Sequence, residues 1–453
     1  MSFVRNSHRT FEEAPISTVA VTNFTGDFWI DFSAMVKWCA ANGNVSRHHR
    51  QDVFRMSVEP YGIDVTTVED PVQRTDSIVR HALSLVENDV EHWQGLYEDL
   101  ADLDSKMLLL NVVAYRAMGW RYVKMPLDSG AFWDCLATLG QIELKAPTYG
   151  DGGMRLFDLN GLGADVKLAS EAFGVFNEFV YSQYAYRGRR GLLTPQEGDC
   201  VLDCGACFGG TTLFFADAVG PSGRVISYEF FPENVAVFKD NVALNPLLSD
   251  RITLVPRPVW IQTGAVMSIQ GSGPATQVFV GEEDLHSRAT DSRQFRSISI
   301  DDTVREYHLE RVDLIKMDIE GSEMSALRGA RETIRRFRPN LAICVYHKLV
   351  DFFEIPREIK EMNLGYKFYL QHSTVHGDET VIFATARGFN ANRLDDIEDA
   401  AKARSRAEVA LLKASEAEAK ATRLEVELAI IRKSRSWRVT GPLRRAFSTL
   451  RRS

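Results

Sequence analysis

The sequence predicts a doubly wound α/β domain between about Leu192 and Thr385. Short apolar runs typical of buried strands recur from Val201 onward, helical patterns separate most of these runs, and a glycine-rich turn joins the first run to a helix. Strands and helices that alternate in this way are typical of a mostly parallel sheet with helices on both faces.

The segment before this domain, residues 1–170, is predicted to be an α+β region of unknown role. It contains β-like runs such as 16–21, and apolar residues at three- and four-residue steps predict helices between Thr75 and Gly119, where the glycine is a typical helix stop. The α/β domain is assigned residues 171–390. Its expected strands are 201–203, 224–228, 252–255, 314–317, 341–345 and 380–385.

Residues 391–433 are predicted to form a coiled coil. Apolar side chains recur there at alternating steps of three and four residues, namely Ala400, Ala403, Ala407, Ala410, Ala414, Ala417, Ala421, Leu424, Leu428 and Ile431. An alanine seam buries little area, so a single helix packed on the domain surface is the alternative. The pattern predicts a homo-oligomer or a partner coil through residues 400–431.

The last residues, 434–453, are predicted to be a basic amphipathic tail. From Arg432 to Ser453 the chain carries lysines and arginines but no acid, and Trp437, Leu443 and Phe447 lie between them. Such a segment is typical of a helix that lies on an anionic membrane surface, so residues 432–453 are expected to contact lipid. The alternative is a solvated or partner-binding tail.

The composition fits a cytoplasmic protein. The net charge of −8, with 25% charged residues, gives no general sign of nucleic-acid binding. The six cysteines lack the spacing of a secreted disulfide framework, and no uncharged run reaches the roughly 18 residues of a membrane span. We therefore expect no signal peptide, no membrane helix and no nucleic-acid partner, and a location in the cytoplasm or at the inner face of a membrane.

The most informative segment is a strand that enters a glycine turn and then a helix, residues 201–212. Asp203, Gly205, Ala206 and Gly209 form this turn in the order D-x-G-x-x-x-G, which suits S-adenosyl-L-methionine better than the G-x-G-x-x-G pattern of dinucleotide-binding proteins. Glycines let a ligand touch the backbone. All four residues are predicted to bind the cofactor, with Gly205 and Ala206 near its methionine portion.

An acidic residue follows the second strand. Glu229 comes directly after the run 224–228, about twenty residues beyond the glycine turn, where a carboxylate can accept both ribose hydroxyls. NAD enzymes share this arrangement, so an NAD-dependent enzyme is an alternative interpretation. The remaining alternative is a glycine turn followed by a solvated glutamate.

A second constellation lies beyond two later strands. Asp318, Glu320 and Glu323 follow the strand at 312–317, and His347 follows the next strand. Ligands bind at the carboxyl ends of strands in such sheets, so Asp318, Glu320 and His347 are the predicted catalytic residues, and Asp318 is also expected to touch the cofactor. His347 can take a hydroxyl proton, or the three can hold a divalent cation such as Mg²⁺. The alternative is a helix N-cap by Asp318 or Ser322.

With these segments in view, the chain from about Phe173 to Thr385 resembles the FkbM family of methyltransferases. The resemblance is carried by Gly198 to Ala206, Tyr228 to Phe230, Pro232 to Asn234, Lys316 to Gly321, and Glu379 to Val381. It implies a Rossmann-like class I methyltransferase fold and S-adenosylmethionine-dependent methyl transfer to oxygen, commonly on sugars or polyketide-like products. The segment Ser434 to Arg444 is similar to tails on bacterial polysaccharide-modifying enzymes, which implies a cell-surface polysaccharide or glycolipid acceptor.

Two classes of function follow from these patterns. The first is an O-methyltransferase acting on a small-molecule or glycan hydroxyl, in which His347 acts as a base or helps to bind a metal. The second is a non-catalytic scaffold that binds cofactor or glycan and is organised by the coiled coil. A pure binder has no need of Asp318, Glu320 and His347 around one edge, so the cluster favours the enzyme.

Overall fold

The computed structural model describes residues 24–43, 71–139, 143–149, 154–188, 191–270, 277–280 and 293–389. The chain divides after Ala400 into two units, and all of these residues lie in the first. The predicted coiled coil and basic tail lie outside the described residues. These two predictions, and the oligomer and lipid contacts that rest on them, therefore stay predictions.

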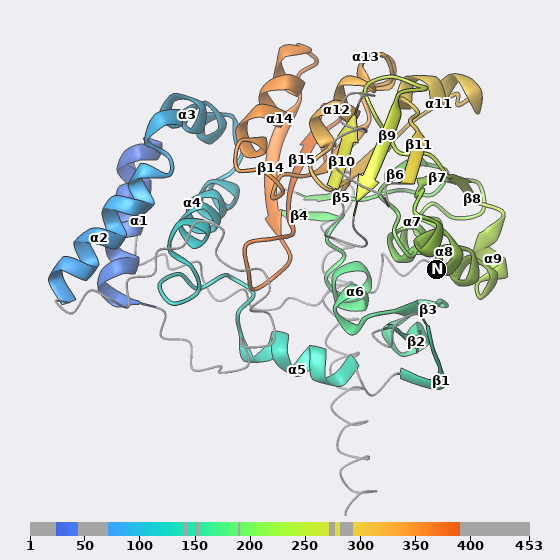
Figure 1. Ribbon diagram of the computed structural model, residues 1–453, viewed down its shortest axis with the longest axis horizontal. Helices are drawn as coiled ribbons and strands as arrows, with labels where there is room; N and C mark the ends of the chain where they lie inside the picture. The colour runs from blue at the N-terminus through green and yellow to red at the C-terminus, as the bar shows by residue number, and fades with distance from the viewer. Residues whose placement is uncertain are drawn as a thin grey trace, which may run out of the picture. The chain divides into compact units, whose positions relative to one another are not determined.

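A seven-stranded sheet forms the centre of the fold, in the order β14–β15–β13–β12–β6–β7–β8 (Figure 1). The five strands from β13 to β8 are parallel, and β15 runs antiparallel to both β13 and β14. Each predicted strand is present, which confirms the mostly parallel sheet. The strands are β6 (Cys200–Cys204), β7 (Arg224–Tyr228), β8 (Ile252–Val255), β12 (Leu314–Met317), β13 (Asn340–Cys344), β14 (Lys367–His372) and β15 (Thr380–Thr385).

Side chains alternate along these strands between two hydrophobic cores. On β6, Leu202 and Cys204 pack in one core with helices α11, α13 and α14, while Val201 packs in the other with α7. A strand buried on both faces needs a mostly apolar run rather than an alternating one. The exceptions on β6 and β12 are Asp203 and Lys316, which pair with each other. The helices of this domain are α7 (Gly210–Ala218), α8 (Pro232–Ala243), α9 (Pro246–Ser249), α11 (Ile300–Glu306), α12 (Glu323–Arg328), α13 (Arg331–Phe337) and α14 (Asp351–Glu361).

The N-terminal helices extend the first of these cores. Phe28, Trp93 and Leu109 are buried in it together with side chains of the sheet. The predicted helical stretch is divided before α4, because Asp102 caps that helix by accepting from the Ser105 amide at 2.8 Å. As predicted, α4 ends immediately before Gly119. The N-terminal helices are α1 (Phe28–Asn42), α2 (Pro71–Ser84), η3 (Glu87–Asp89), α3 (Val90–Asp99), α4 (Leu103–Met118) and α5 (Gly130–Leu139). The buried side chains of α5 lie in the second core instead.

Smaller elements surround the main sheet. One antiparallel sheet contains β1–β2–β3, another contains β10–β9–β11, and β4 pairs with β5. Their bounds are β1 (Glu143–Tyr149), β2 (Met154–Asp158), β3 (Lys167–Ser170), β4 (Tyr186–Gly188), β5 (Gly191–Leu193), β9 (Val266–Gln270), β10 (Gln277–Val280) and β11 (Arg293–Arg296). The short helices η4 (Leu159–Leu162), α6 (Ala172–Val175) and η5 (Phe176–Tyr181), the last a π-helix, complete the described chain.

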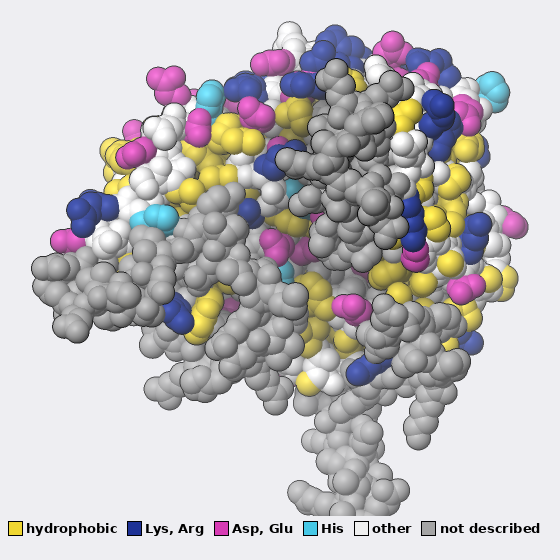
Figure 2. Space-filling model, in the orientation of Figure 1, with side chains coloured by type: hydrophobic (Ala, Val, Ile, Leu, Met, Phe, Trp, Pro, Cys, Tyr) yellow, Lys and Arg dark blue, Asp and Glu magenta, His cyan; other side chains and the backbone are white. Residues whose placement is uncertain are grey.

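The described surface has no single dominant charge on the face seen in Figure 2. Basic and acidic side chains are interspersed there among apolar ones. Within the described ranges, no helix has both the length and the hydropathy needed to cross a membrane.

Candidate functional site

The glycine turn after β6 lies in direct contact with the segment after β12. Gly205 and Ala206 donate their amides to the Tyr228 carbonyl at 3.1 and 2.9 Å. Gly205 has φ +85°, and a Cβ placed on it would stand 1.8 Å from the Asp318 carbonyl oxygen. The turn therefore has room only for glycine at this position.

A buried ion pair stabilises the glycine turn. The Lys316 ammonium lies 3.1 Å from the Asp203 carboxylate and donates to the Gly205 carbonyl at 2.6 Å. Asp203 also accepts from the Thr212 hydroxyl at 2.6 Å. Although burial lowers the pKa of Lys316, the carboxylates of Asp203 and Asp318 outweigh it and hold that pKa above its usual range. Asp203 thus positions Lys316, which holds the Gly205 carbonyl.

Replacing Lys316 with methionine is expected to destabilise the fold by about 3–5 kcal/mol, because the substitution leaves the buried Asp203 carboxylate unpaired. Urea denaturation at pH 7 measures this loss. The double variant Lys316→Met/Asp203→Asn should recover much of it. Lys360→Met, which breaks the exposed pair with Asp99, is the control and should cost less than about 1 kcal/mol. Equal losses for the two single lysine variants would contradict the proposed role of the buried pair.

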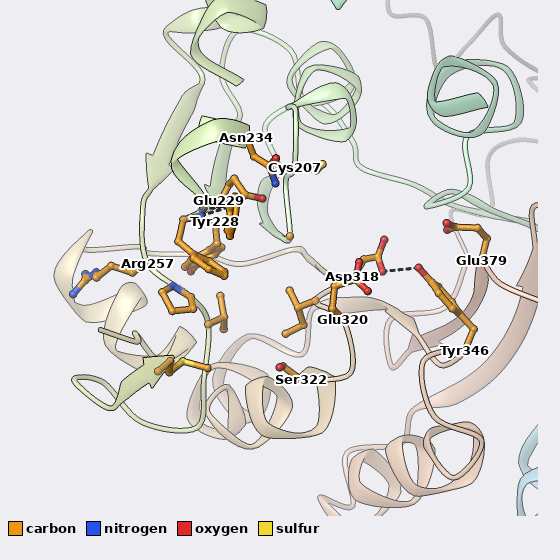
Figure 3. A pocket seen from close by; sticks show the side chains of 17 residues that line it. Cys207, Tyr228, Glu229, Asn234, Arg257, Asp318, Glu320, Ser322, Tyr346 and Glu379 are labelled. Atoms are coloured by element: carbon orange, nitrogen blue, oxygen red, sulfur yellow. Dashed lines mark hydrogen bonds between the residues drawn. The ribbon is translucent and has the colours of Figure 1, made fainter. Parts of the chain in front are cut away.

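A cavity of about 260 Å³ opens beyond the carboxyl ends of β6, β7 and β12 (Figure 3). Of the predicted site residues, it brings together Gly205, Glu229, Asp318 and Glu320. Asp203, Ala206, Gly209 and His347 are not among its lining residues. The wall consists of Gly205, Cys207, Tyr228, Glu229, Phe230, Phe231, Asn234, Arg257, Pro258, Val259, Met267, Asp318, Ile319, Glu320, Ser322, Tyr346 and Glu379.

Glu229 stands at one end of the cavity, where the sequence predicts it. Its Oε1 accepts from the amides of Phe230 and Phe231 at 2.8 and 2.7 Å, which fixes the carboxylate at the end of β7. Burial raises its pKa, and hydrogen bonds, among them those from Phe231 and Asn234, offset part of the rise. A carboxylate held in this way can accept hydroxyl groups through its second oxygen.

The opposite end of the cavity is acidic. Asp318 accepts from the Tyr184 hydroxyl at 2.7 Å and from the Tyr346 hydroxyl at 3.0 Å. Burial alone would raise its pKa, but Lys316 and His347 hold it below the usual value. Asp318 is therefore an ionised carboxylate in contact with the cavity at neutral pH. Neither tyrosine has a role predicted from the sequence.

His347 lies behind this edge, between three carboxylates. Its Nδ1 is 3.1 Å from Glu323, and its Nε2 is 3.3 Å from Glu320 and 3.7 Å from Asp318. Burial lowers the pKa of His347, but contacts with Glu320 and Glu323 dominate and raise it to about 11. The imidazole is therefore protonated at neutral pH and supplies positive charge to the cluster.

The predicted metal ligands Asp318, Glu320 and His347 do lie together. Among the residues that the structure describes, the set whose ligand atoms all lie within 4.8 Å of one another contains Glu323 in place of Glu320. Glu323 is fully buried, and its Oε1 also accepts from the Ile319 amide at 2.8 Å. From sequence, Glu323 is predicted only to be one of the acids that follow the strand at 312–317.

Glu379 is a further acidic residue of the cavity, and the sequence predicted no role for it. It lies just before β15, lines the cavity, and its Oε2 accepts from the Gln183 amide at 3.1 Å. Burial, together with the nearby Asp318 charge, raises the pKa of Glu379 to about 8. A carboxyl group with this pKa in a cavity can exchange a proton near neutral pH. The only signal for it in the sequence is that it begins the segment Glu379 to Val381, which resembles the FkbM family.

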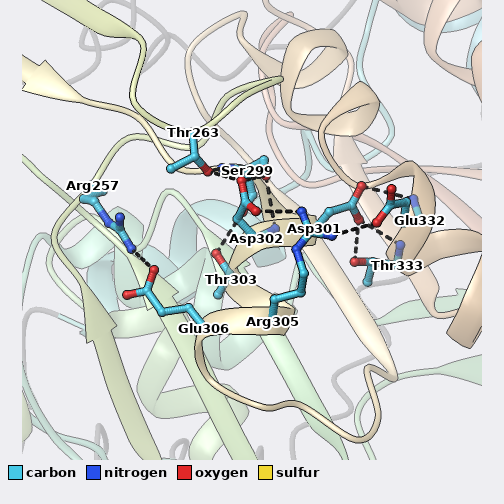
Figure 4. A network of polar contacts seen from close by, with 10 residues as sticks. All are labelled: Arg257, Thr263, Ser299, Asp301, Asp302, Thr303, Arg305, Glu306, Glu332 and Thr333. Atoms are coloured by element: carbon cyan, nitrogen blue, oxygen red, sulfur yellow. Dashed lines mark hydrogen bonds and ion pairs between the residues drawn. The ribbon is translucent and has the colours of Figure 1, made fainter.

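The cavity wall contributed by the loop after β8 is held by a polar network (Figure 4). Arg257 pairs with Glu306 at 2.6 Å, and the Ser299 amide donates to the Thr263 hydroxyl at 3.0 Å. Ser299 also caps α11 by accepting from the Asp302 amide at 3.1 Å. This network fixes the loop against α11.

Comparisons with known proteins agree with the family resemblance expected from the sequence. A family model described as the methyltransferase FkbM domain matches residues 203–368. No curated protein matches the chain. Among solved structures, the chain is similar to methyltransferase FkbM from Methylobacillus flagellatus, with 18% identity, a TM-score of 0.42, and coverage of 70% of this chain and 65% of that one.

Two further solved structures are similar over part of the chain. Aeropyrum pernix fibrillarin in complex with S-adenosyl-L-methionine has 16% identity and a TM-score of 0.28, over 54% of this chain and 100% of that one. A methyltransferase from Geobacter sulfurreducens has 12% identity and a TM-score of 0.26, over 42% of this chain and 71% of that one. The chain thus spans 65% of the length of the Methylobacillus protein.

Proposed function

We propose that the chain is an S-adenosylmethionine-dependent O-methyltransferase that acts on a sugar hydroxyl of a cell-surface polysaccharide or glycolipid. The match of residues 203–368 to the methyltransferase FkbM domain supports the methyltransferase part of this proposal. The observation that carries the proposal is one cavity that joins Glu229, after β7, to Asp318 and Glu320, after β12. Cofactor and acceptor can therefore meet in a single space at the carboxyl edge of the sheet.

The residues of the cavity suit this cofactor. Glu229 is fixed at the end of β7 by the amides of Phe230 and Phe231, where its carboxylate can accept ribose hydroxyls, and Gly205 lets a ligand approach the backbone. Phe230, Pro258 and Met267 give the cavity an apolar wall of the kind that accepts a flat base. When bound, S-adenosylmethionine supplies a methyl group on a sulfonium that is already an activated leaving group.

The chain's own contribution is to align the acceptor and to remove one proton. Asp318 and Glu320 can each accept a hydrogen bond from an acceptor hydroxyl, and Asp318 is held in position by Tyr184 and Tyr346. As the hydroxyl oxygen forms its bond to the methyl carbon, the O–H proton must pass to a base. The sequence predicts His347 for this role, and the cavity offers Glu379 as the second candidate.

The proposed function is tested first by binding and then by turnover. Calorimetry with the full chain should show binding of S-adenosylmethionine and no binding of NAD. Mass spectrometry of host glycans with and without the protein should then show a gain of one methyl group. Cofactor binding without any methylated product would instead support the scaffold function, and binding of NAD alone would overturn the proposal.

The proposal also includes a location and partners. We place the enzyme in the cytoplasm or at the inner membrane face, as a homo-oligomer or with a partner coil through residues 400–431. The alanine seam and the basic residues 432–453 support this part of the proposal. Analytical ultracentrifugation and liposome co-sedimentation of the full chain and of a chain ending at Lys433 test the two contacts separately.

A divalent cation bound by Asp318, Glu320 and His347 is the alternative to a protonated His347 as the source of positive charge at the acidic end of the cavity. A histidine that binds metal must first lose its proton, and the pKa of about 11 for His347 opposes this step at neutral pH. We therefore expect methyl transfer to continue at its full rate after dialysis against EDTA. Loss of turnover that is restored by Mg²⁺ would instead establish the metal site.

A further inference from the structure

The turn that follows the π-helix η5 places consecutive side chains against two acids of the cavity. The Gln183 side-chain amide donates to Glu379 Oε2 at 3.1 Å, and the Tyr184 hydroxyl donates to Asp318 Oδ2 at 2.7 Å. Both acids line the cavity, at the end away from Glu229 (Figure 3). One short turn therefore fixes the two carboxyl groups relative to each other, although one follows β12 and the other precedes β15.

The side chain of Gln183 has a fixed orientation. Its amide oxygen accepts from the Ser373 hydroxyl at 3.2 Å, so its NH₂ group is the part that faces Glu379. The backbone amide of Gln183 donates to the Asn177 carbonyl of η5 at 2.9 Å. Gln183 and Ser373 are both buried, and buried polar side chains that are hydrogen-bonded to each other hold one arrangement. Gln183 thus presents a donor to Glu379 at a fixed position.

The backbone of Glu379 also points to a functional role for this side chain. Its φ of +65° lies in the left-handed region, which is unfavourable for an L-residue and easy for glycine. Residues held in this way cluster at functional sites. The Ser373 amide donates to the Glu379 carbonyl at 3.2 Å, which holds the strained residue in place. Ser373 therefore contacts both the backbone of Glu379 and the side chain that fixes its carboxyl group.

Several charged groups around Glu379 act on its carboxyl group together with Gln183. After the larger effect of burial, Asp318 and Asp378 raise the pKa of Glu379. His347 and the hydrogen bond from Gln183 lower it. Further titratable groups near it, whose own pKa values are raised by burial first and by Glu379 in part, are Tyr184, Cys344 and Tyr346. Loss of the Gln183 donor therefore raises the pKa of Glu379 further.

We propose that Gln183 is the positioning residue for Glu379, with its amide oriented by Ser373, and that it holds the carboxyl group where it meets the acceptor hydroxyl. This inference rests on the proposed function, with Glu379 as the base, and adds residues that act through that base. The acceptor O–H proton passes to the Glu379 carboxylate as the acceptor oxygen bonds to the methyl carbon. The carbon–sulfur bond breaks in the same step and S-adenosylhomocysteine leaves. Fixing the base in this geometry is what Gln183 contributes to the rate.

The test measures turnover of the full chain with S-adenosylmethionine and with glycan extracted from host cells that lack the protein. Gln183→Met removes the donor and keeps a similar side-chain length. We expect kcat at pH 7.5 to fall by about 10- to 100-fold and the Kd of S-adenosylhomocysteine to change by less than about twofold. The rise in turnover with pH should also move to higher pH. Gln371→Met is the matched control, because this buried amide donates to the Gln183 backbone carbonyl rather than to Glu379, and it should keep the wild-type pH profile.

A double variant shows whether Gln183 acts through Glu379. In the Glu379→Gln background, Gln183→Met should lower kcat by less than about twofold, because the carboxyl group that it positions is already absent. Ser373→Ala keeps the Gln183 amide and removes the hydroxyl that orients it, so it should lower kcat in the same direction by a smaller factor. An equal loss in both backgrounds, or a lower kcat with an unshifted pH profile, would overturn the role of Gln183 and leave the proposed function standing. A wild type that methylates no glycan would instead remove the proposed function, and this role with it.

Discussion

Replacing Gly205 with alanine is expected to abolish cofactor binding and to cost about 3 kcal/mol or more of stability. Two effects add at this position. The backbone has φ +85°, which costs an L-residue roughly 1–2 kcal/mol. The new Cβ would also stand 1.8 Å from the Asp318 carbonyl oxygen, and backbone cannot rotate away as a side chain can. The alanine therefore forces β6 and the acidic segment after β12 apart.

Gly264 provides the matched control for this prediction. It has nearly the same φ, +86°, but nothing lies within 4 Å of the position its Cβ would take. Gly264→Ala should therefore show the cost of the backbone conformation alone, with cofactor binding unchanged. Urea denaturation and calorimetry with S-adenosylmethionine measure the two quantities. If Gly205→Ala loses no more stability than Gly264→Ala and still binds, the contact with Asp318 is not what requires glycine.

The positions of most strands along the chain and the residues at their carboxyl ends could be predicted because they depend on local patterns. Buried parallel strands need continuous apolar runs, and Glu229 and Asp318 come directly after two such runs. Strand β14 was missed because only Phe368, Tyr369 and Leu370 form an apolar run in it, and its pairing with β15 is set by tertiary contact.

The rest of the site depends on contacts between residues far apart in the chain. Tyr184 and Asp318, which form a hydrogen bond, are 134 residues apart in the sequence, and Gln183 and Glu379 are 196 residues apart. The protonation state of His347 follows from three carboxylates that meet around it only in the folded chain. Sequence spacing carries no information about such distances, so it indicated a reactive histidine but not the charge on it.

Glu379→Gln is expected to lower kcat by about 10²- to 10⁴-fold and to remove the pH dependence of turnover between pH 6 and 9. We assign Glu379 as the base, which must be ionised to accept the hydroxyl proton. With a pKa of about 8, the ionised fraction of Glu379 falls about tenfold for each pH unit below that value. Wild-type turnover should therefore rise with pH and level off above pH 8. The glutamine variant keeps an oxygen for Gln183 but cannot take a proton.

His347→Gln separates this assignment from the prediction made from sequence. The His347 charge lowers the pKa of Glu379, so removing the charge should move the rise in turnover to higher pH without abolishing it. The variant should be slow at pH 7.5 and recover much of its activity at pH 9.5. If His347, with a pKa of about 11, were the base, the results would be the opposite. Wild-type turnover would keep rising well above pH 8, and the His347→Gln variant would stay slow at every pH.

The two pH profiles therefore decide which residue takes the proton, provided that both variants still bind cofactor. Calorimetry with S-adenosylhomocysteine supplies this control, because Glu379 lies away from Glu229 in the cavity (Figure 3) and His347 is not among the residues that line it. If Glu379→Gln retains the wild-type rise near pH 8, the assigned base is wrong. In that case Glu320 is the remaining carboxyl to test, since it lines the same cavity and burial raises its pKa as well.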